Sequence, residues 1–166
     1  MDISRQSFLI IAVYTLTGGC LAKIQTTDED VNPDAIFEYE KGKHAFDKAE
    51  EIWETAITNY NMDNWAQASQ QFQFTQDKYT QSRKYFEKVT NMNIPDDAIE
   101  YANQSSKHVE AMSEAAKYFS NSASGYALVD VEQIDENYEL GQKYLEMAQK
   151  IPAPVEVTTF RSTLQQ

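Results

Sequence analysis

The fold is decided by residues 35–89, which read AIFEYEKGKHAFDKAEEIWETAITNYNMDNWAQASQQFQFTQDKYTQSRKYFEKV. Aromatic residues recur every seven positions on two segments: Tyr39, Phe46, Trp53 and Tyr60, then Trp65, Phe72, Tyr79 and Phe86. Short side chains recur with the same period: Ala35, Gly42, Ala49 and Ala56, then Ala68, Thr75, Ser82 and Val89. Alternating steps of four and three place both rows on one helix face. The pattern therefore predicts two long helices whose rings pack into the space left by small residues.

Turn and capping residues set the limits of these helices. Asn32, Pro33 and Asp34 are typical of a helix start, so the first helix is expected from 34 to about 60. Asn64 with Gln67 resembles a capping box, which starts the second helix and ends it near Asn91. The short connection predicts that the two helices run antiparallel.

The second half of the chain predicts another helical hairpin. One helix is expected at about 95–121, ending in the segment Asn121–Gly125, which is rich in Ser, Asn and Gly. A last helix is expected at about 131–151, and Pro152 stops it. Residues 152–166 have no helical period and are expected to be an extended tail. The fold class is therefore all-α, an antiparallel four-helix bundle of two long hairpins over residues 34–151.

Two short motifs add a resemblance to a repeat family. They are Ser82-x3-Phe86-x2-Val89 and Gly141-x3-Leu145-x2-Ala148, the latter followed by Pro152. Each resembles the second helix of a tetratricopeptide repeat, a family built from stacked helical hairpins. The repeats of that family have about 34 residues and short helices. The helices expected here are almost twice as long, so a four-helix bundle distantly similar to these repeats is favoured.

The N-terminus predicts export. Arg5 precedes an apolar run, Phe8–Leu16, which is too short to span a bilayer but suits a signal peptide. Leu16-Thr17-Gly18-Gly19-Cys20 resembles the lipobox of prokaryotic (bacterial or archaeal) lipoproteins, although Thr17 stands where Leu is usual. The resemblance implies that residues 1–19 are removed and that Cys20 carries a diacylglyceryl group. An ordinary signal peptide with a chance cysteine, or a short buried helix, is the alternative.

Residues 20–33 then read as the lipidated cysteine and a flexible tether, because they mix polar and acidic groups without periodicity. The expected location is the outer, extracytoplasmic face of a membrane, in the cell envelope or periplasm. Cys20 is the only cysteine, so no intramolecular disulfide can form. The formal net charge of -12 disfavours nucleic acid as a partner, since both would repel.

The sequence offers little for catalysis. Zinc spacing, a phosphate loop and a nucleophile elbow do not occur in it, and no metal or cofactor is expected. Haem bound by His108 with Met92 or Met147 is a minor possibility. The favoured function is a non-catalytic module that holds a protein or peptide partner near the membrane. The alternative is a carrier that binds a small ligand or cofactor in an aromatic-lined interior. Trp53, Tyr60 and Trp65, near the first turn, are the candidate binding mouth.

Overall fold

The computed structural model describes residues 32–128 and 131–165, without the side chains of 131–133, and this part of the chain is helical with no strand. The helices are α1 (Pro33–Asn61), α2 (Trp65–Thr90), α3 (Asp96–Leu128), α4 (Val131–Gln149) and α5 (Val157–Thr163). The all-α prediction is confirmed. The predicted signal peptide, Cys20 and most of the tether lie outside the described residues.

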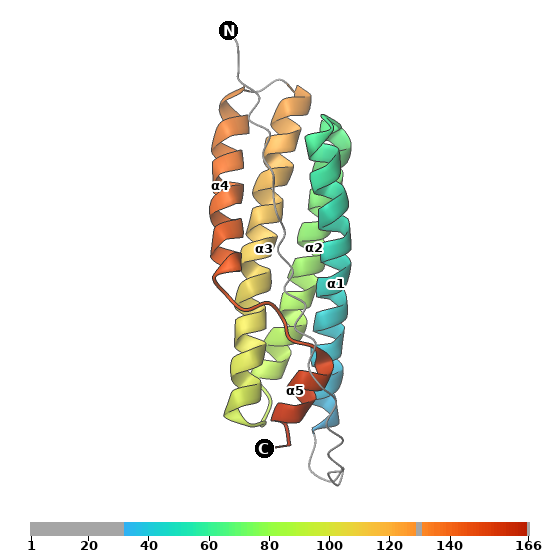
Figure 1. Cartoon of the computed structure of the whole chain (residues 1–166), viewed down its shortest axis with the longest axis vertical. Coiled ribbons are helices and arrows are strands. Elements are labelled where there is room, and N and C mark those ends of the chain that lie inside the picture. The colour runs from blue at the N-terminus through green and yellow to red at the C-terminus, as the bar shows by residue number, and fades with distance from the viewer. Residues whose placement is uncertain (1–31, 129–130, 166) are drawn as a thin grey trace.

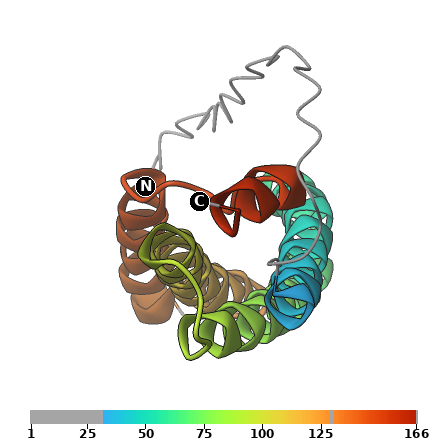
Figure 2. The same ribbon diagram turned by 90° about the horizontal axis from the view of Figure 1, so that it is seen from below.

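The four long helices alternate in direction and pack in chain order. α1 and α3 run one way, α2 and α4 the other, so that the α1–α2 turn and the end of α3 lie at one end (Figure 1). Seen along the helices, they follow one another around an arc, and α5 lies on its open side (Figure 2). Over the described residues, no Cα atom of α1 lies within 8 Å of one of α4. The layer is therefore open between its first and last long helices, and α5 packs there against α1 and α3.

The two heptad rows form the α1–α2 interface as predicted. Phe72, Tyr79 and Phe86 are fully buried, and so are the small residues opposite them. The closest approach is at Gly42, where an added Cβ atom would lie 2.7 Å from Cε1 of Phe86. The Ser82 hydroxyl donates to the Gly42 carbonyl at 2.7 Å. A glycine in the middle of α1 therefore lets α2 come close enough for a side chain of α2 to bond the backbone of α1.

Helix α3 continues to Leu128, so the prediction that it ends within 121–125 was wrong. Serine favours helix ends because its hydroxyl competes for nearby backbone groups. Here the hydroxyls bond to neighbouring helices instead. Ser120 donates to the carbonyl of Ser69 at 3.0 Å, and Ser122 donates to the carbonyl of Ile134 at 3.1 Å. These serines are interhelical contacts of α3 with α2 and α4, and they do not end α3.

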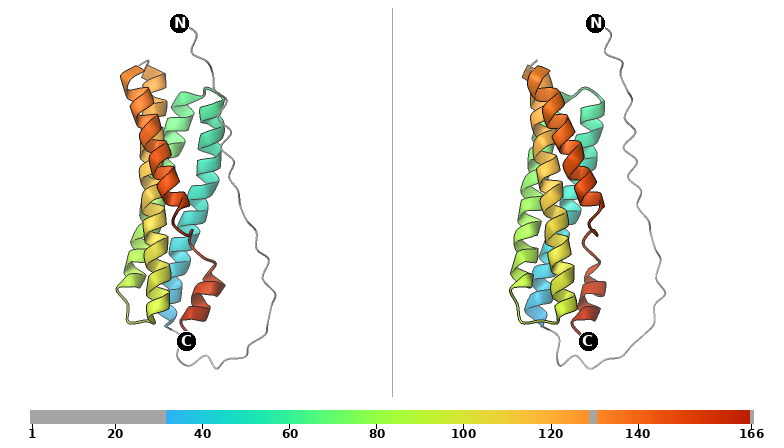
Figure 3. Two further views of the ribbon diagram at one scale, coloured as in Figure 1. Left: turned by 60° about the vertical axis from the view of Figure 1, so that its left-hand side comes forward. Right: turned by 90° about the vertical axis from the view of Figure 1, so that its left-hand side faces the viewer.

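The tail was predicted to be extended, and this holds only for its first part. Residues 152–156 are not helical, whereas 157–163 form α5. α4 crosses α3 obliquely, so that the segment after it is carried toward α1 (Figure 3). There Phe160 is fully buried, and its ring stacks on that of Tyr39. This short helix has no heptad pattern, and the burial of Phe160, together with that of Thr163 and Leu164, holds it against the long helices.

The first cap forms as expected and the second does not. The side chain of Asn32 accepts a hydrogen bond from the amide of Ala35 at 3.1 Å. Asn64 precedes α2, but its side chain makes no cap and donates to Oδ1 of Asn59 at 3.1 Å instead. Among the helices of the described ranges, none combines the length and apolar character needed to cross a membrane.

Candidate functional site

The aromatic residues gather at the end of the bundle made by the α1–α2 turn and the end of α3, here called the distal end. Trp65 at the start of α2 stacks on Tyr126 of α3, with ring centroids 4.1 Å apart and planes 14° apart. Tyr60 of α1 meets both rings edge-on, at 5.0 Å from Trp65 and 6.1 Å from Tyr126. Tyr60 also faces Tyr138 of α4, at 6.2 Å. Four helices therefore contribute to one aromatic cluster.

The structure brings Tyr60 and Trp65 together but places Trp53 in the core. Trp53 is 7% exposed, and its indole ring packs edge-on against Phe72 and Phe119 at 5.3 and 5.7 Å. It lies two turns before Tyr60 on α1, on the same face, which is why the sequence pattern could not separate the two. Only two of the three predicted mouth residues reach the distal end.

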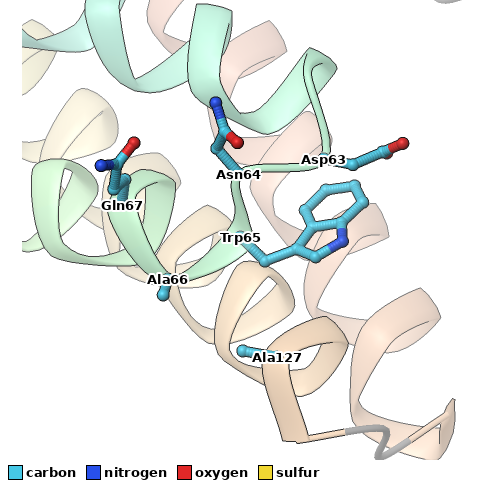
Figure 4. A pocket seen from close by; sticks show the side chains of 6 residues that line it. All are labelled: Asp63, Asn64, Trp65, Ala66, Gln67 and Ala127. Atoms are coloured by element: carbon cyan, nitrogen blue, oxygen red, sulfur yellow. The ribbon is translucent and has the colours of Figure 1, made fainter.

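A surface hollow of about 400 Å³ opens beside Trp65. It is lined by Asp63, Asn64, Trp65, Ala66, Gln67 and Ala127. The side chains of Asp63 and Trp65 extend in the same direction, away from α2 (Figure 4). Asp63 has a φ of 61°, in the left-handed region that glycine or asparagine adopts most easily. This turn therefore holds a carboxylate beside the indole ring, in a backbone conformation that glycine would adopt at a lower energetic cost.

The distal end is apolar at its surface and carries only negative charge. Met62 is 66% exposed, Leu128 79% and Tyr126 39%. The sequence has no Lys or Arg between Lys48 and Lys78, a segment that includes the distal ends of α1 and α2. The same is true between Lys117 and Lys143, for α3 and α4. Every charged side chain in these two segments is Asp or Glu, so this end differs from the rest of the bundle.

The buried hydroxyl of Tyr60 has a polar partner. Oη of Tyr60 lies 2.9 Å from Oγ of Ser122, which donates its own hydrogen to Ile134, so Tyr60 is the donor. Burial raises the pKa of Tyr60 well above its usual range, and the bond to Ser122 opposes this. Burial also raises the pKa of Tyr126, and the negative charges of Asp135 and Asp63 add to the effect. The negative charges of these carboxylates therefore disfavour loss of the proton from the hydroxyl of Tyr126.

The open side of the layer is occupied by the chain's own C-terminal segment. Oη of Tyr39 lies 3.3 Å from the carbonyl oxygen of Val155 and 3.2 Å from Oγ of Ser105. Nζ of Lys43 lies 3.2 Å from Oε1 of Glu156. Nδ1 of His108 lies 3.0 Å from the carbonyl oxygen of Ile151. Residues 151–160 are thus held against α1 and α3 by hydrogen bonds and one ion pair.

The polar groups near His108 form contacts within the protein. Tyr79 donates a hydrogen bond to Oε1 of Glu50. Burial lowers the pKa of His108, while its bond to Ile151 and the charge of Glu50 oppose this. Over the ranges that the structure describes, no three His, Cys, Asp or Glu residues converge on a position that could hold a metal ion. His108 contacts the C-terminal segment through Ile151, and Glu50 contacts α2 through Tyr79.

Comparison with known proteins adds no family. No family model, no curated protein and no solved structure matches this chain. Tyr126 could have been placed in it from the sequence, because it continues the seven-residue row of Ala98, Ser105, Met112 and Phe119. Asp63 had no such signal, since its role depends on the conformation of the turn.

Proposed function

We propose that this protein is a lipoprotein anchored through Cys20 to the outer face of a membrane, where its helices hold a protein partner. In this proposal residues 20–33 are the tether, and the four antiparallel helices over 34–151 act as one bundle. The aromatic cluster at the distal end, with its hollow beside Trp65 and its exposed apolar side chains, is the observation that carries it. An exposed apolar patch bordered by polar residues is typical of an interaction surface.

The arrangement of the bundle supports an orientation in which the distal end faces away from the membrane. α1 begins at the end opposite the distal end, so a tether joined to residue 33 would bring that end closest to the membrane (Figure 1). α1 has 29 residues and is therefore about 43 Å long. The aromatic cluster would then be presented to partners about that far from the first turn of α1. The Lys and Arg residues of the long helices lie outside residues 49–77 and 118–142, so the acidic end, which anionic lipid repels, would face away from the membrane.

A carrier of a small ligand is the alternative proposal. It needs aromatic side chains that face a ligand, whereas the rings of Trp53, Phe72 and Phe119 face one another at 5.3 to 5.7 Å. Close packing of this kind leaves the space between these rings filled. The geometry of the core therefore favours the interaction module, and an enzyme has the least support.

Membrane fractionation with cross-linking tests the proposal. The wild-type chain is expected in the membrane fraction, cross-linked to one protein partner, and Cys20→Ser is expected to leave the membrane. Native mass spectrometry of the purified chain tests the carrier, and a mass without a bound small molecule decides against it. A protein that shows no specific cross-linked partner and carries a small molecule in equal amount would overturn the interaction module and support the carrier.

A further inference from the structure

We infer that the distal end binds a basic segment of the protein partner, with an arginine guanidinium between the indole of Trp65 and the carboxylate of Asp63. This inference rests on the proposed function and names the chemistry of the partner. It follows from the aromatic ring, the carboxylate and the charge of the surrounding helices.

The indole ring offers a surface for a cation. Tyr126 covers one face of Trp65 and Tyr60 meets its edge, so the ring is held in a fixed orientation. The hollow of about 400 Å³ that Trp65 lines lies at the surface, which gives a partner side chain access to the ring. The quadrupole of tryptophan attracts a cation more strongly than that of tyrosine or phenylalanine. A planar guanidinium both stacks on such a ring and keeps its hydrogens for other partners.

The carboxylate of Asp63 supplies the second contact. It lines the same hollow and extends in the same direction as the indole ring (Figure 4). The turn holds Asp63 with a φ of 61°, which costs more for aspartate than for glycine. A backbone outlier at a surface hollow is a reason to look for function there. Arginine suits this geometry because it can stack on the ring and donate to the carboxylate at the same time.

The charge of the distal end selects among possible occupants. Every charged side chain of the segments between Lys48 and Lys78 and between Lys117 and Lys143 is acidic. Besides burial, the charge of Asp135 raises the pKa of Tyr60 and of Tyr126, and the charge of Asp63 raises the pKa of Tyr126. An acidic surface repels anionic lipid headgroups and nucleic acid, although Met62 and Leu128 are exposed there. The distal end of a second copy would meet like charge. A cationic segment of another protein has the complementary charge.

The test is a titration of the full chain, purified from membranes in detergent micelles, with the peptide acetyl-Gly-Arg-Gly-Arg-Gly-amide. The chain has two tryptophans, so the indole N–H resonances of Trp53 and Trp65 can be followed separately by nuclear magnetic resonance. The Trp65 resonance should shift on adding the peptide, and that of the buried Trp53 should not. The same peptide with citrulline in place of arginine keeps the shape and loses the charge, so it should give no shift.

Two matched variants separate specific pairing from general attraction. Asp63→Asn removes the charge and keeps a residue that accepts a positive φ, so the variant should fold. Its affinity for the arginine peptide should be about fivefold lower than that of the wild type. Glu146→Gln removes the same charge from an exposed position near the other end of α4 and should leave the affinity unchanged. Equal weakening by both variants, equal binding of the citrulline peptide, or a silent Trp65 resonance would overturn the inference.

A photo-cross-linking residue in place of Gln67, an exposed residue that lines the hollow and makes neither proposed contact, distinguishes this failure from failure of the proposed function when the full chain is in its own membrane. A specific protein cross-linked through an uncharged segment, with no response to the arginine peptide, would overturn only the cationic partner. Loss of both the cross-link and the peptide response would remove the interaction module as well. A cross-link to a basic segment of one protein, with the peptide response, supports both.

Discussion

The ring of Phe160 in α5 lies flat against the ring of Tyr39 in α1, with centroids 3.9 Å apart and planes 3° apart. This contact joins α5, a helix of seven residues, to α1. Within the described residues, α5 packs against α1 and α3 and against no other long helix. Phe160→Ala should therefore release α5, with a local cost of about 3–5 kcal/mol. Hydrogen exchange should show lost protection in 157–163 while α2 and α3 keep theirs. Thr159→Ala, at an exposed position, is the control. Continued protection of α5 in Phe160→Ala would contradict the contact's role.

Gly42 and Gly141, two of the buried helix glycines, should respond differently to alanine. A Cβ atom at Gly42 would lie 2.7 Å from Cε1 of Phe86, which is fully buried and has little room to move. Overpacking of this kind costs about 1–3 kcal/mol, more than the gain of up to about 1 kcal/mol in helix propensity. At Gly141 the nearest atom of Phe119 would lie at 3.1 Å, a milder contact. Urea denaturation should show Gly42→Ala as the less stable variant. A Gly42→Ala protein more stable than Gly141→Ala would contradict the close approach of α1 and α2.

Stability should fall in alkaline solution because of Tyr39. Burial raises its pKa to about 12, while its bonds to Ser105 and Val155 oppose the rise. The unfolded chain, with a pKa near 10, loses the proton first, so the contribution to stability is complete below pH 10 and is lost as the pH rises toward 12. The total is about 2–3 kcal/mol. Urea midpoints measured from pH 9 upward, to about 11.5, should fall less steeply for Tyr39→Phe than for wild type. Equal slopes would show that the pKa of the Tyr39 phenol is the same in the folded and unfolded chains.

Acid should destabilise the fold through His108. Burial lowers its pKa from 6.5, so the unfolded chain binds a proton more readily than the folded chain. The contribution is present above pH 6.5 and is lost as the pH falls through and below that value. His108→Gln keeps a side-chain donor for the carbonyl of Ile151 and removes the titration. Between about pH 7.5 and 5.5, the urea midpoint of wild type should fall more than that of this variant. A steeper fall in the variant would contradict the sign of the shift.

The sequence predicts the first hairpin well because its signal is redundant. Eight aromatic residues and eight small ones keep one period, and a single register satisfies both rows. The second half carries fewer rings, and its serines have two roles that the sequence alone does not distinguish. Ser120 and Ser122 could end a helix or bond to another helix, and only the neighbours Ser69 and Ile134 decide. α5 is missed for a related reason, since Phe160 has no periodic partner until Tyr39 lies beside it.

The candidate site follows the same division. Tyr60 and Trp65 lie on either side of a short turn, so their proximity can be predicted from the chain alone. The burial of Trp53 depends on Phe119, which is more than sixty positions away in the chain, and could not be predicted. The contribution of Asp63 depends on a backbone angle. Local pairs are therefore predictable, while the depth of a ring and the direction of a carboxylate depend on tertiary structure.

The proposed function depends most on an anchor at Cys20, because a tether there would give the bundle its orientation and its distal end a partner to reach. Intact mass spectrometry of the protein extracted from native membranes tests the anchor directly. We predict a chain that starts at Cys20, lacks residues 1–19 and carries the added mass of a diacylglyceryl group. A chain that retains Met1, or one that starts elsewhere with an unmodified Cys20, would contradict the account.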